Sequence, residues 1–107
     1  MTEPVDPADR EIRLAIWKIH ILHHAAEGPI YGLWMMHELA EHGHRLSPGT
    51  LYPILSRMEK NGWLTSVPGQ SRRERREYRI TKAGRSLLAR LRSEIKELHD
   101  ELTEEKT

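Results

Sequence analysis

Three amphipathic segments, each closed by a helix-stop signal, divide residues 9–62 and constrain the fold more than any other feature of the sequence. Gly28-Pro29 ends the first segment, Gly43 the second and Asn61-Gly62 the third. A glycine just after a helix, or a proline shortly beyond it, prevents the helix from continuing. The N-terminal part of the chain is therefore expected to fold as three short helices and not as one long helix.

The apolar spacing gives each predicted helix a buried face, because residues three or four apart lie on the same side of a helix. The first helix starts at Asp9 or a neighbouring cap, and its apolar residues are Ile12, Ala15, Ile16, Ile19, Leu22 and Ala26. The second runs from Tyr31 to His42, with Leu33, Met36 and Ala40 on one face and Met35 and Leu39 beside them. The third begins near Ser47-Pro48, and its apolar stripe is Leu51, Ile54, Leu55 and Met58.

A hairpin and a long helix follow the three short helices. Residues 63–67 and 78–80 have the composition of strands, with turn-forming residues after the first of them. Thr81 can cap the last helix, in which leucine and isoleucine recur at heptad spacing. Three helices followed by a charged hairpin is the order of the winged helix-turn-helix, whose third helix enters the major groove of DNA. We therefore expect a mainly α fold with a small β-hairpin: a flexible tail at residues 1–8, a winged-helix DNA-binding domain at 9–81 and a dimerisation helix at 82–107.

Composition limits the alternatives. A chain of 107 residues suits one domain, and its 17 basic and 16 acidic residues give a net charge of +1, which indicates neither nucleic acid nor membrane as a partner. The positive charge is local, since residues 72–92 carry nine basic and two acidic residues, a net charge of +7. The chain has no cysteine, no secretory-signal pattern and no apolar run of about 18 residues, so a cytoplasmic protein with no membrane partner is expected.

The side of the third helix opposite its apolar stripe is predicted to face DNA. It begins at the capping serine and consists of Ser47, Gly49, Thr50, Tyr52, Pro53, Ser56, Arg57 and Lys60. Small groups in the first turn let a duplex approach closely, and basic groups further along suit phosphate contacts. Because of Pro53, the sequence does not decide whether the helix is capped by Ser47 or by Thr50. Counted from Ser47, it forfeits a hydrogen bond to the Gly49 carbonyl at a cost of up to about 3 kcal/mol, whereas counted from Thr50 it loses none.

The turn and second strand of the hairpin carry the densest positive charge. Arg72, Arg73, Arg75 and Arg76 lie there, close to Arg79. Guanidinium groups on a protruding wing suit phosphate contacts or insertion into a narrow minor groove. The alternative is a solvated charged hairpin, because Glu74 and Glu77 partly neutralise the run.

The final helix predicts self-association. Its apolar residues are Leu87, Leu88, Leu91, Ile95, Leu98 and Leu102. A heptad seam has little to pack against in so small a domain, whereas two copies bury each other's seams. In the alternative, the residues from Leu87 to Ile95 fold back onto the first helix of the same chain.

Histidines are frequent in the first two helices. His20 and His24 are four residues apart on one helix face, a spacing that suits a metal ion, with Glu27 nearby. Packed or capping histidines are commoner, so no metal and no cofactor is expected, and a histidine-based metal sensor remains the alternative. The sequence shows no nucleophile and base in a catalytic arrangement, no paired carboxylates and no glycine-rich phosphate loop, so no catalytic residue is expected.

Three stretches of the sequence resemble the PadR family of bacterial transcriptional regulators: PIYGLWMMHEL, LSPGTLYPILSRMEKNGWL and RREYRITKAGRSLL. The resemblance covers about residues 19–95, and the single terminal helix is similar to the short branch of the family. It implies a winged-helix domain that reads operator DNA, a C-terminal homodimerisation segment, and repression relieved by a small effector of unknown identity. By motif, residues 47–53 match the recognition helix, residues 72–76 match the wing, and Tyr31 matches the phosphate-facing start of the second helix.

Some relatives in the family bind flat aromatic compounds between tryptophans of their terminal helices, and the terminal helix of this chain differs from theirs. Residues 82–107 contain no Trp, Tyr or Phe, so a binding pore of that kind is not expected. Trp17 and Trp34 are expected to pack in the core, with a pocket near the dimer interface as the alternative. The sequence thus predicts a homodimeric repressor of a palindromic operator, without enzymatic activity. A winged-helix module that docks other proteins is the alternative from a different class.

Overall fold

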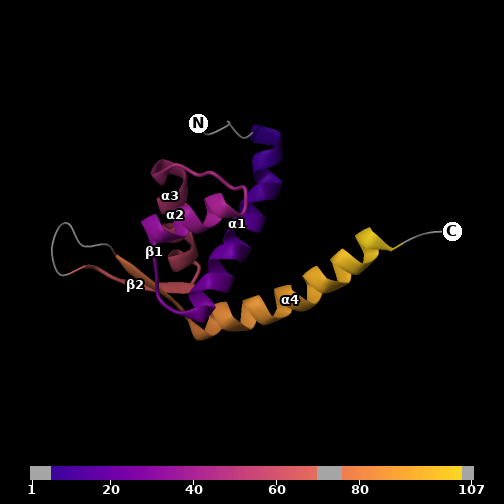
Figure 1. Ribbon diagram of the computed structural model, residues 1–107. Coiled ribbons are helices and arrows are strands. Elements are labelled where there is room, and N and C mark those ends of the chain that lie inside the picture. The colour runs from indigo at the N-terminus through magenta and orange to yellow at the C-terminus, as the bar shows by residue number, and fades with distance from the viewer. Residues whose placement is uncertain (1–5, 70–75, 105–107) are drawn as a thin grey trace.

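The computed structural model describes residues 6–69 and 76–104 of the chain. Its elements in chain order are α1 (Pro7–Glu27), β1 (Ile30–Tyr31), α2 (Gly32–Glu41), α3 (Pro48–Lys60), β2 (Leu64–Val67), β3 (Glu77–Ile80) and α4 (Lys82–Thr103). The first three helices pack together, β2 and β3 project to one side as a wing, and α4 extends away from the rest (Figure 1). The predicted order of helices, hairpin and long helix is confirmed. Among the described residues, no helix combines the length and the apolar character that crossing a membrane requires.

The sheet has three strands where the sequence predicted two. β2 and β3 form the expected antiparallel hairpin, and β1 pairs with the other edge of β3, with Ile30 opposite Tyr78 and Tyr31 opposite Glu77. A strand of two residues is too short to show an alternating pattern, so β1 was not predicted from the sequence. Its consequence is that the start of α2 is attached to the wing.

The structure shows which residues cap the starts of α1 and α4. α1 begins at Pro7, inside the predicted tail, and its cap is Asp6, whose side chain accepts a hydrogen bond from the amide of Ala8 at 2.8 Å. The predicted cap at Asp9 is therefore wrong by three residues, and proline at the first helical position fits the observed start. For α4 the predicted cap is confirmed, since the Thr81 hydroxyl accepts from the amide of Gly84 at 3.0 Å.

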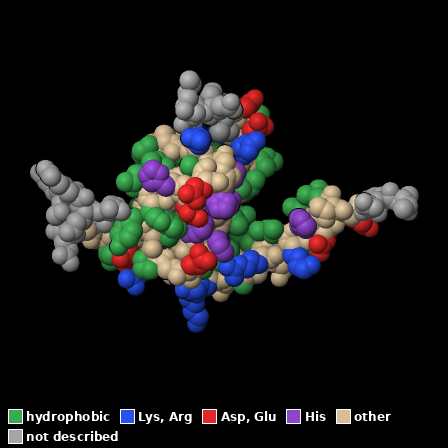
Figure 2. All heavy atoms as spheres, in the orientation of Figure 1, with side chains coloured by type: hydrophobic (Ala, Val, Ile, Leu, Met, Phe, Trp, Pro, Cys, Tyr) green, Lys and Arg blue, Asp and Glu red, His purple; other side chains and the backbone are tan. Residues whose placement is uncertain are grey.

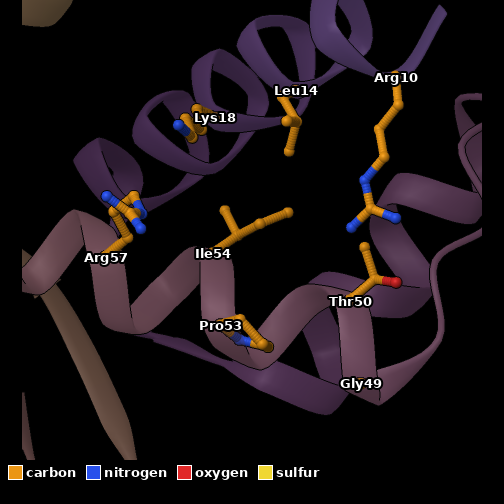
Figure 3. A pocket seen from close by; sticks show the side chains of 8 residues that line it. All are labelled: Arg10, Leu14, Lys18, Gly49, Thr50, Pro53, Ile54 and Arg57. Atoms are coloured by element: carbon orange, nitrogen blue, oxygen red, sulfur yellow. The ribbon is translucent and has the colours of Figure 1, made fainter. Parts of the chain in front are cut away.

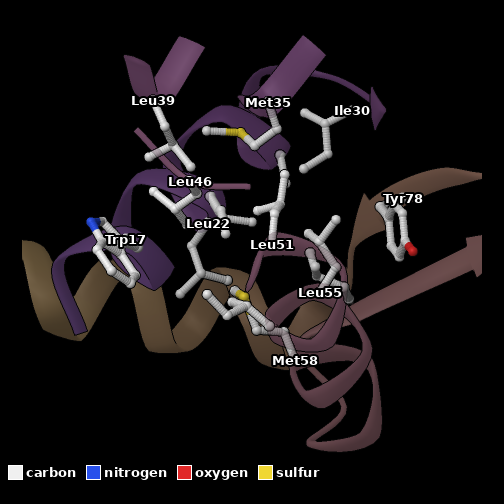
Figure 4. Close-up of a cluster of buried hydrophobic side chains, with 14 of the residues drawn as sticks. Trp17, Leu22, Ile30, Met35, Leu39, Leu46, Leu51, Leu55, Met58 and Tyr78 are labelled. Carbon is white, nitrogen blue, oxygen red and sulfur yellow. The ribbon is translucent and has the colours of Figure 1, made fainter. Parts of the chain in front are cut away.

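The core forms where α1, α2 and α3 meet the sheet and the beginning of α4 (Figure 4). The buried stripe of α3 is as predicted, with Leu51, Ile54, Leu55 and Met58 inside. On α2 the prediction is wrong by part of a turn: Met35 and Leu39 are fully buried, whereas Leu33 is 46% exposed. Pairing of β1 with β3 fixes how α2 is rotated as it leaves the sheet, and this rotation lies beyond the reach of a local apolar pattern.

Before Leu14, which packs against this core, α1 lies outside it, and so does the C-terminal half of α4. Ile12 is 70% exposed and Ile16 is 39% exposed, contrary to the predicted apolar face, and the buried residues of α1 begin at Trp17. Trp34, which was expected in the core, is 44% exposed. On α4 the last buried residue is Leu88, and beyond it the helix projects into solvent.

Candidate nucleic-acid interface

The outer face of α3 lies where the sequence placed it. Its four buried residues face the core, and the opposite side exposes Gly49, Tyr52, Pro53, Ser56, Arg57 and Lys60, with Thr50 half-buried at the edge. Arg57 and Lys60 lie in the last turn, and Lys60 is about 18 Å along the helix axis from the first residue. The two ends of this face can therefore contact different parts of a duplex, with small groups at the start and cations at the end.

The structure decides where α3 starts. Ser47 is the cap, in an extended conformation, and its carbonyl accepts from the amides of Thr50 and Leu51, both at 3.0 Å. Pro53 is therefore the sixth residue of the helix, and the Gly49 carbonyl loses the amide partner that a different residue would supply. Gly49 is exposed, so water can take that place, and the proline leaves a short, stiff outer surface.

Tyr52 is positioned by a glycine on the neighbouring helix. A Cβ atom built on Gly32 would lie 2.5 Å from Cε1 of Tyr52 and 2.7 Å from its hydroxyl oxygen, so the ring lies directly against the first turn of α2. Only a glycine leaves room for the phenol in this position. The sequence identified both residues in separate motifs, but their contact appears only in the tertiary structure.

A basic hollow lies between α1 and α3 beside this face. It has a volume of about 210 Å³ and is lined by Arg10, Leu14, Lys18, Gly49, Thr50, Pro53, Ile54 and Arg57. Leu14 and Ile54 point toward each other across it, and Arg10 reaches toward Thr50 (Figure 3). Arg10 and Lys18 thus add two cations to the surface around α3. Sequence reasoning missed both, although their spacing with Leu14 at steps of four marks one face of α1.

A chain of side-chain hydrogen bonds fastens the base of the wing to α3. The hydroxyl of Ser66 on β2 donates to Oε2 of Glu59 at 2.7 Å, and Nη1 of Arg76 donates to the Ser66 hydroxyl oxygen at 3.1 Å. Arg76 therefore lies beside α3, just before the start of β3. Arg72, Arg73 and Arg75, the other predicted wing residues, lie outside the described part of the chain.

Tyr31, which was predicted to contact phosphate, is hydrogen-bonded to the wing. The Tyr31 hydroxyl donates to Oε1 of Glu77 at 3.2 Å, and Nε of Arg79 donates to Oε2 of the same carboxylate at 2.6 Å. These two hydrogen bonds, that of Arg79 first, hold the pKa of Glu77 below its usual value. Glu77 therefore keeps a negative charge that compensates Arg79, and Arg79 is a weaker candidate for phosphate binding than Arg76.

The predicted dimerisation residues fall into two groups along α4. Leu88 is buried in the chain's own core, and Leu87 and Leu91 pack against it. Ile95, Leu98 and Leu102 are 40%, 48% and 74% exposed. The fold-back alternative thus describes Leu87, Leu88 and Leu91 but not Ile95. The weak metal candidates His20 and His24 belong to a separate cluster between α1 and the end of α2.

Several known proteins are similar to this chain in sequence and fold. The model of the transcriptional regulator PadR-like family matches residues 21–90. A Mycobacterium tuberculosis protein, transcriptional regulator Rv3488, is 47% identical over 97 residues, which span 87% of this chain and 88% of that protein. A PadR-like transcription factor from Bacteroides fragilis has a TM-score of 0.79 at 26% identity, over 91% of this chain and 96% of that one. A PadR family regulator from Eggerthella lenta has a TM-score of 0.72 at 29% identity, over 89% and 81% of the two chains.

These relatives are transcriptional regulators and not enzymes, in agreement with the sequence. The winged-helix fold of these PadR-like regulators is found here as well. The chain therefore belongs to the PadR-like family of DNA-binding transcriptional regulators.

Proposed function

We propose that the protein is a homodimeric repressor that binds a palindromic operator and is released from it by a small effector. The observation that carries the homodimer is the second half of α4. Ile95, Leu98 and Leu102 continue the heptad spacing of Leu88 and Leu91, yet no part of the described chain covers them. Each such side chain contributes about 1.5–3 kcal/mol when it is fully buried. A second copy of α4 offers a matching seam.

The exposed apolar residues on α1 support the same proposal. Ile12 and Ile16 are exposed on the N-terminal half of α1, so they offer further apolar surface to a partner. A two-fold dimer uses the same patch on both subunits, and each subunit can then present α1 and α4 to the other. The total apolar surface available is larger than the α4 seam alone provides.

The two-fold symmetry also explains a palindromic site. Each subunit presents one α3, and two recognition helices related by a two-fold axis read half-sites of opposite orientation, about 34 Å apart or a multiple of that distance. We assign base reading to Thr50 and Tyr52, near the start of α3, with Ser47, Gly49 and Pro53 allowing the close approach. Phosphate contacts are assigned to the basic residues and to one tyrosine: Tyr31, Arg57, Lys60, Arg72, Arg73, Arg75 and Arg76.

Repression follows from occupancy, because a dimer on two adjacent major grooves excludes polymerase from an overlapping promoter. The effector is a small molecule that does not stack between aromatic residues of the terminal helices, since residues 82–107 provide none. A regulator of this kind acts on chromosomal DNA in the cytoplasm.

The dimer is tested by placing charge in the exposed seam. Ile95→Asp with Leu98→Asp should give a monomer near 12.5 kDa by light scattering, whereas the unchanged chain gives twice that mass. Ala89→Asp with Ser93→Asp is the matched control, because it adds the same charges on the exposed outer side of the same helix. A seam variant that remains dimeric would contradict the proposal.

The operator and the direction of regulation have their own measurements. The dimer should prefer a palindrome over a single half-site, and the seam variant should lose that preference because its two helices are no longer linked. In transcription in vitro, adding the protein should lower the yield of a transcript whose promoter contains the site. If the protein shows no sequence preference on any duplex, it does not read an operator. If adding it raises the transcript yield, it is not a repressor.

A further inference from the structure

A cluster of histidines from two helices lies apart from the DNA-binding face. His20 and His24 are on α1, His42 caps the end of α2 and His44 follows in the loop. The His20 ring centroid is 5.0 Å from that of His42 and 5.3 Å from that of His44. Each of His20, His24 and His42 offers a ring nitrogen, and the three nitrogens lie within 4.8 Å of one another. Histidine side chains gather with acidic ones on this side of the molecule (Figure 2).

The fold brings these rings together by two local devices. His20 and His24 are four residues apart and lie one above the other on α1. At the end of α2, Gly43 adopts a positive φ of 87°, and the amide of His44 bonds back to the Leu39 carbonyl at 2.9 Å. This turn directs His42 and His44 toward α1. The arrangement therefore follows from backbone geometry at two separate places and not from one exposed run of histidines.

A carboxylate lies beside two of these three rings. Oε1 of Glu38 lies 3.5 Å from Nε2 of His24 and 3.7 Å from Nε2 of His42. Glu38 is half-buried one turn before His42 on α2, so it approaches from the same helix as His42. Three imidazoles and one carboxylate match the ligands that borderline divalent metals such as Zn²⁺, Co²⁺ and Ni²⁺ take. The set does not suit Ca²⁺ or Mg²⁺, which take oxygen ligands, or Cu⁺, which takes sulfur.

Two rings of the cluster, His20 and His44, are half-buried. The pKa of His20 is lowered, first by burial and then by the neighbouring rings of His44, His42, His24 and His23. The pKa of His44 is lowered by burial, then by Arg13 and His42. Among the described residues, neither ring makes a hydrogen bond to another protein group.

We propose that His20, His24 and His42, with Glu38 as the fourth ligand, bind one divalent transition-metal ion of the zinc, cobalt and nickel class per chain. A second group, His23, His24 and Glu27, also brings three ligand atoms within 4.8 Å. All three residues of that group lie on α1, three or four residues apart, so they form ordinary ion pairs between neighbouring turns of one helix. Two of the three are exposed. The first group joins two helices and is the more enclosed. A metal ion there would connect α1 to the turn that precedes α3.

The site is tested by titrating the full chain, free of any histidine tag and of bound metal, with Zn²⁺ against a chromophoric chelator. We expect one ion per chain with a dissociation constant of about micromolar or tighter. His20→Gln and His42→Gln should each weaken binding by at least about tenfold. Circular dichroism shows whether these variants keep the fold. Glu38→Gln, which replaces the proposed fourth ligand on α2, should also weaken zinc binding.

Two controls decide between the groups. His37→Gln removes an exposed histidine from α2 outside the cluster, and His23→Gln removes a member of the competing group; both should bind Zn²⁺ within about twofold of the unchanged chain. With Co²⁺, the visible absorption of four-coordinate cobalt should appear in the unchanged chain and disappear in His42→Gln. Zinc binding weaker than micromolar, or equal binding by the cluster variants and His37→Gln, would overturn the proposal. Loss of binding in His23→Gln alone would overturn the choice of ligands.

Discussion

The contact between Gly32 and Tyr52 allows the reading role of Tyr52 to be tested without touching Tyr52. In Gly32→Ala the new Cβ would lie 2.5 Å from Cε1 of the ring, where ordinary contacts are at least 3.4 Å, so the ring must move by about 1 Å. The atoms that yield belong to an exposed side chain and not to backbone, and the move can be made by rotating the ring. We therefore expect the substitution to displace the phenol and leave the fold intact.

Gly32→Ala should change operator affinity much more than it changes the free energy of unfolding. Turning Tyr52 away from its preferred rotamer costs about 0.5–1.5 kcal/mol, and alanine in a helix recovers up to about 1 kcal/mol relative to glycine. The free energy of unfolding should therefore change by less than about 1 kcal/mol. A base contact is worth about 1–3 kcal/mol, so losing it should weaken operator binding by about 5-fold to 150-fold. Binding to an unrelated duplex should stay nearly constant.

The assay is a double-mutant cycle measured by fluorescence anisotropy on operator and unrelated duplexes. Tyr52→Ala should cause a similar selective loss, and adding Gly32→Ala to it should cost nothing more, because the ring that would be displaced is gone. Gly28→Ala is the control, since a Cβ there meets no atom within 4 Å. Operator affinity unchanged in Gly32→Ala, or losses that add in the double variant, would refute the reasoning.

Three further predictions concern the junctions and the charge of the domain. In Gly84→Ala a Cβ would collide with the carbonyl oxygen of Trp63 and lie 2.8 Å from Cγ1 of Ile80; because a backbone atom cannot yield, we expect a loss of about 1–3 kcal/mol in urea unfolding, and stability equal to that of the unchanged chain would contradict this. Pro53→Ala restores the amide donor to the Gly49 carbonyl and should raise stability by about 1–2 kcal/mol, whereas Pro48→Ala, at the first position of α3, should give no gain. Operator affinity should fall as salt rises from about 50 to 200 mM. Arg73→Ala should weaken binding to all duplexes alike and reduce the slope of log binding constant against log salt concentration by about one. A loss confined to the operator would show that Arg73 reads bases, contrary to the assigned phosphate contact.

Local patterns in the sequence determined the elements that depend on neighbours along the chain. The apolar stripe of α3, the cap at Thr81 and the hairpin were predicted from spacing and capping chemistry, and the structure confirms them. The motifs around Tyr31-Gly32 and in residues 47–53 also placed the chain in its family. These features are readable because helix periodicity, caps and turns act over a few residues.

The tertiary structure decided which faces those elements turn toward each other. Pairing of β1 with β3 rotates α2 so that Met35 and Leu39 are buried and Leu33 is exposed, and it brings Gly32 beneath Tyr52. The start of α3 required the same kind of information, since Ser47 and Thr50 are both acceptable caps and only the observed hydrogen bonds distinguish them.

The ends of the long helices show the limit most clearly. Apolar spacing runs through α1 and α4 without a break, but α1 contacts the core only from Leu14 onward and α4 only as far as Leu91. His42 joins His20 and His24 because the chain turns back at Gly43, a proximity that a separation of more than 15 residues conceals. A sequence states which side of a helix is apolar, because that depends on residues three or four apart. What covers that side depends on residues distant in the chain, and only the folded structure brings them together.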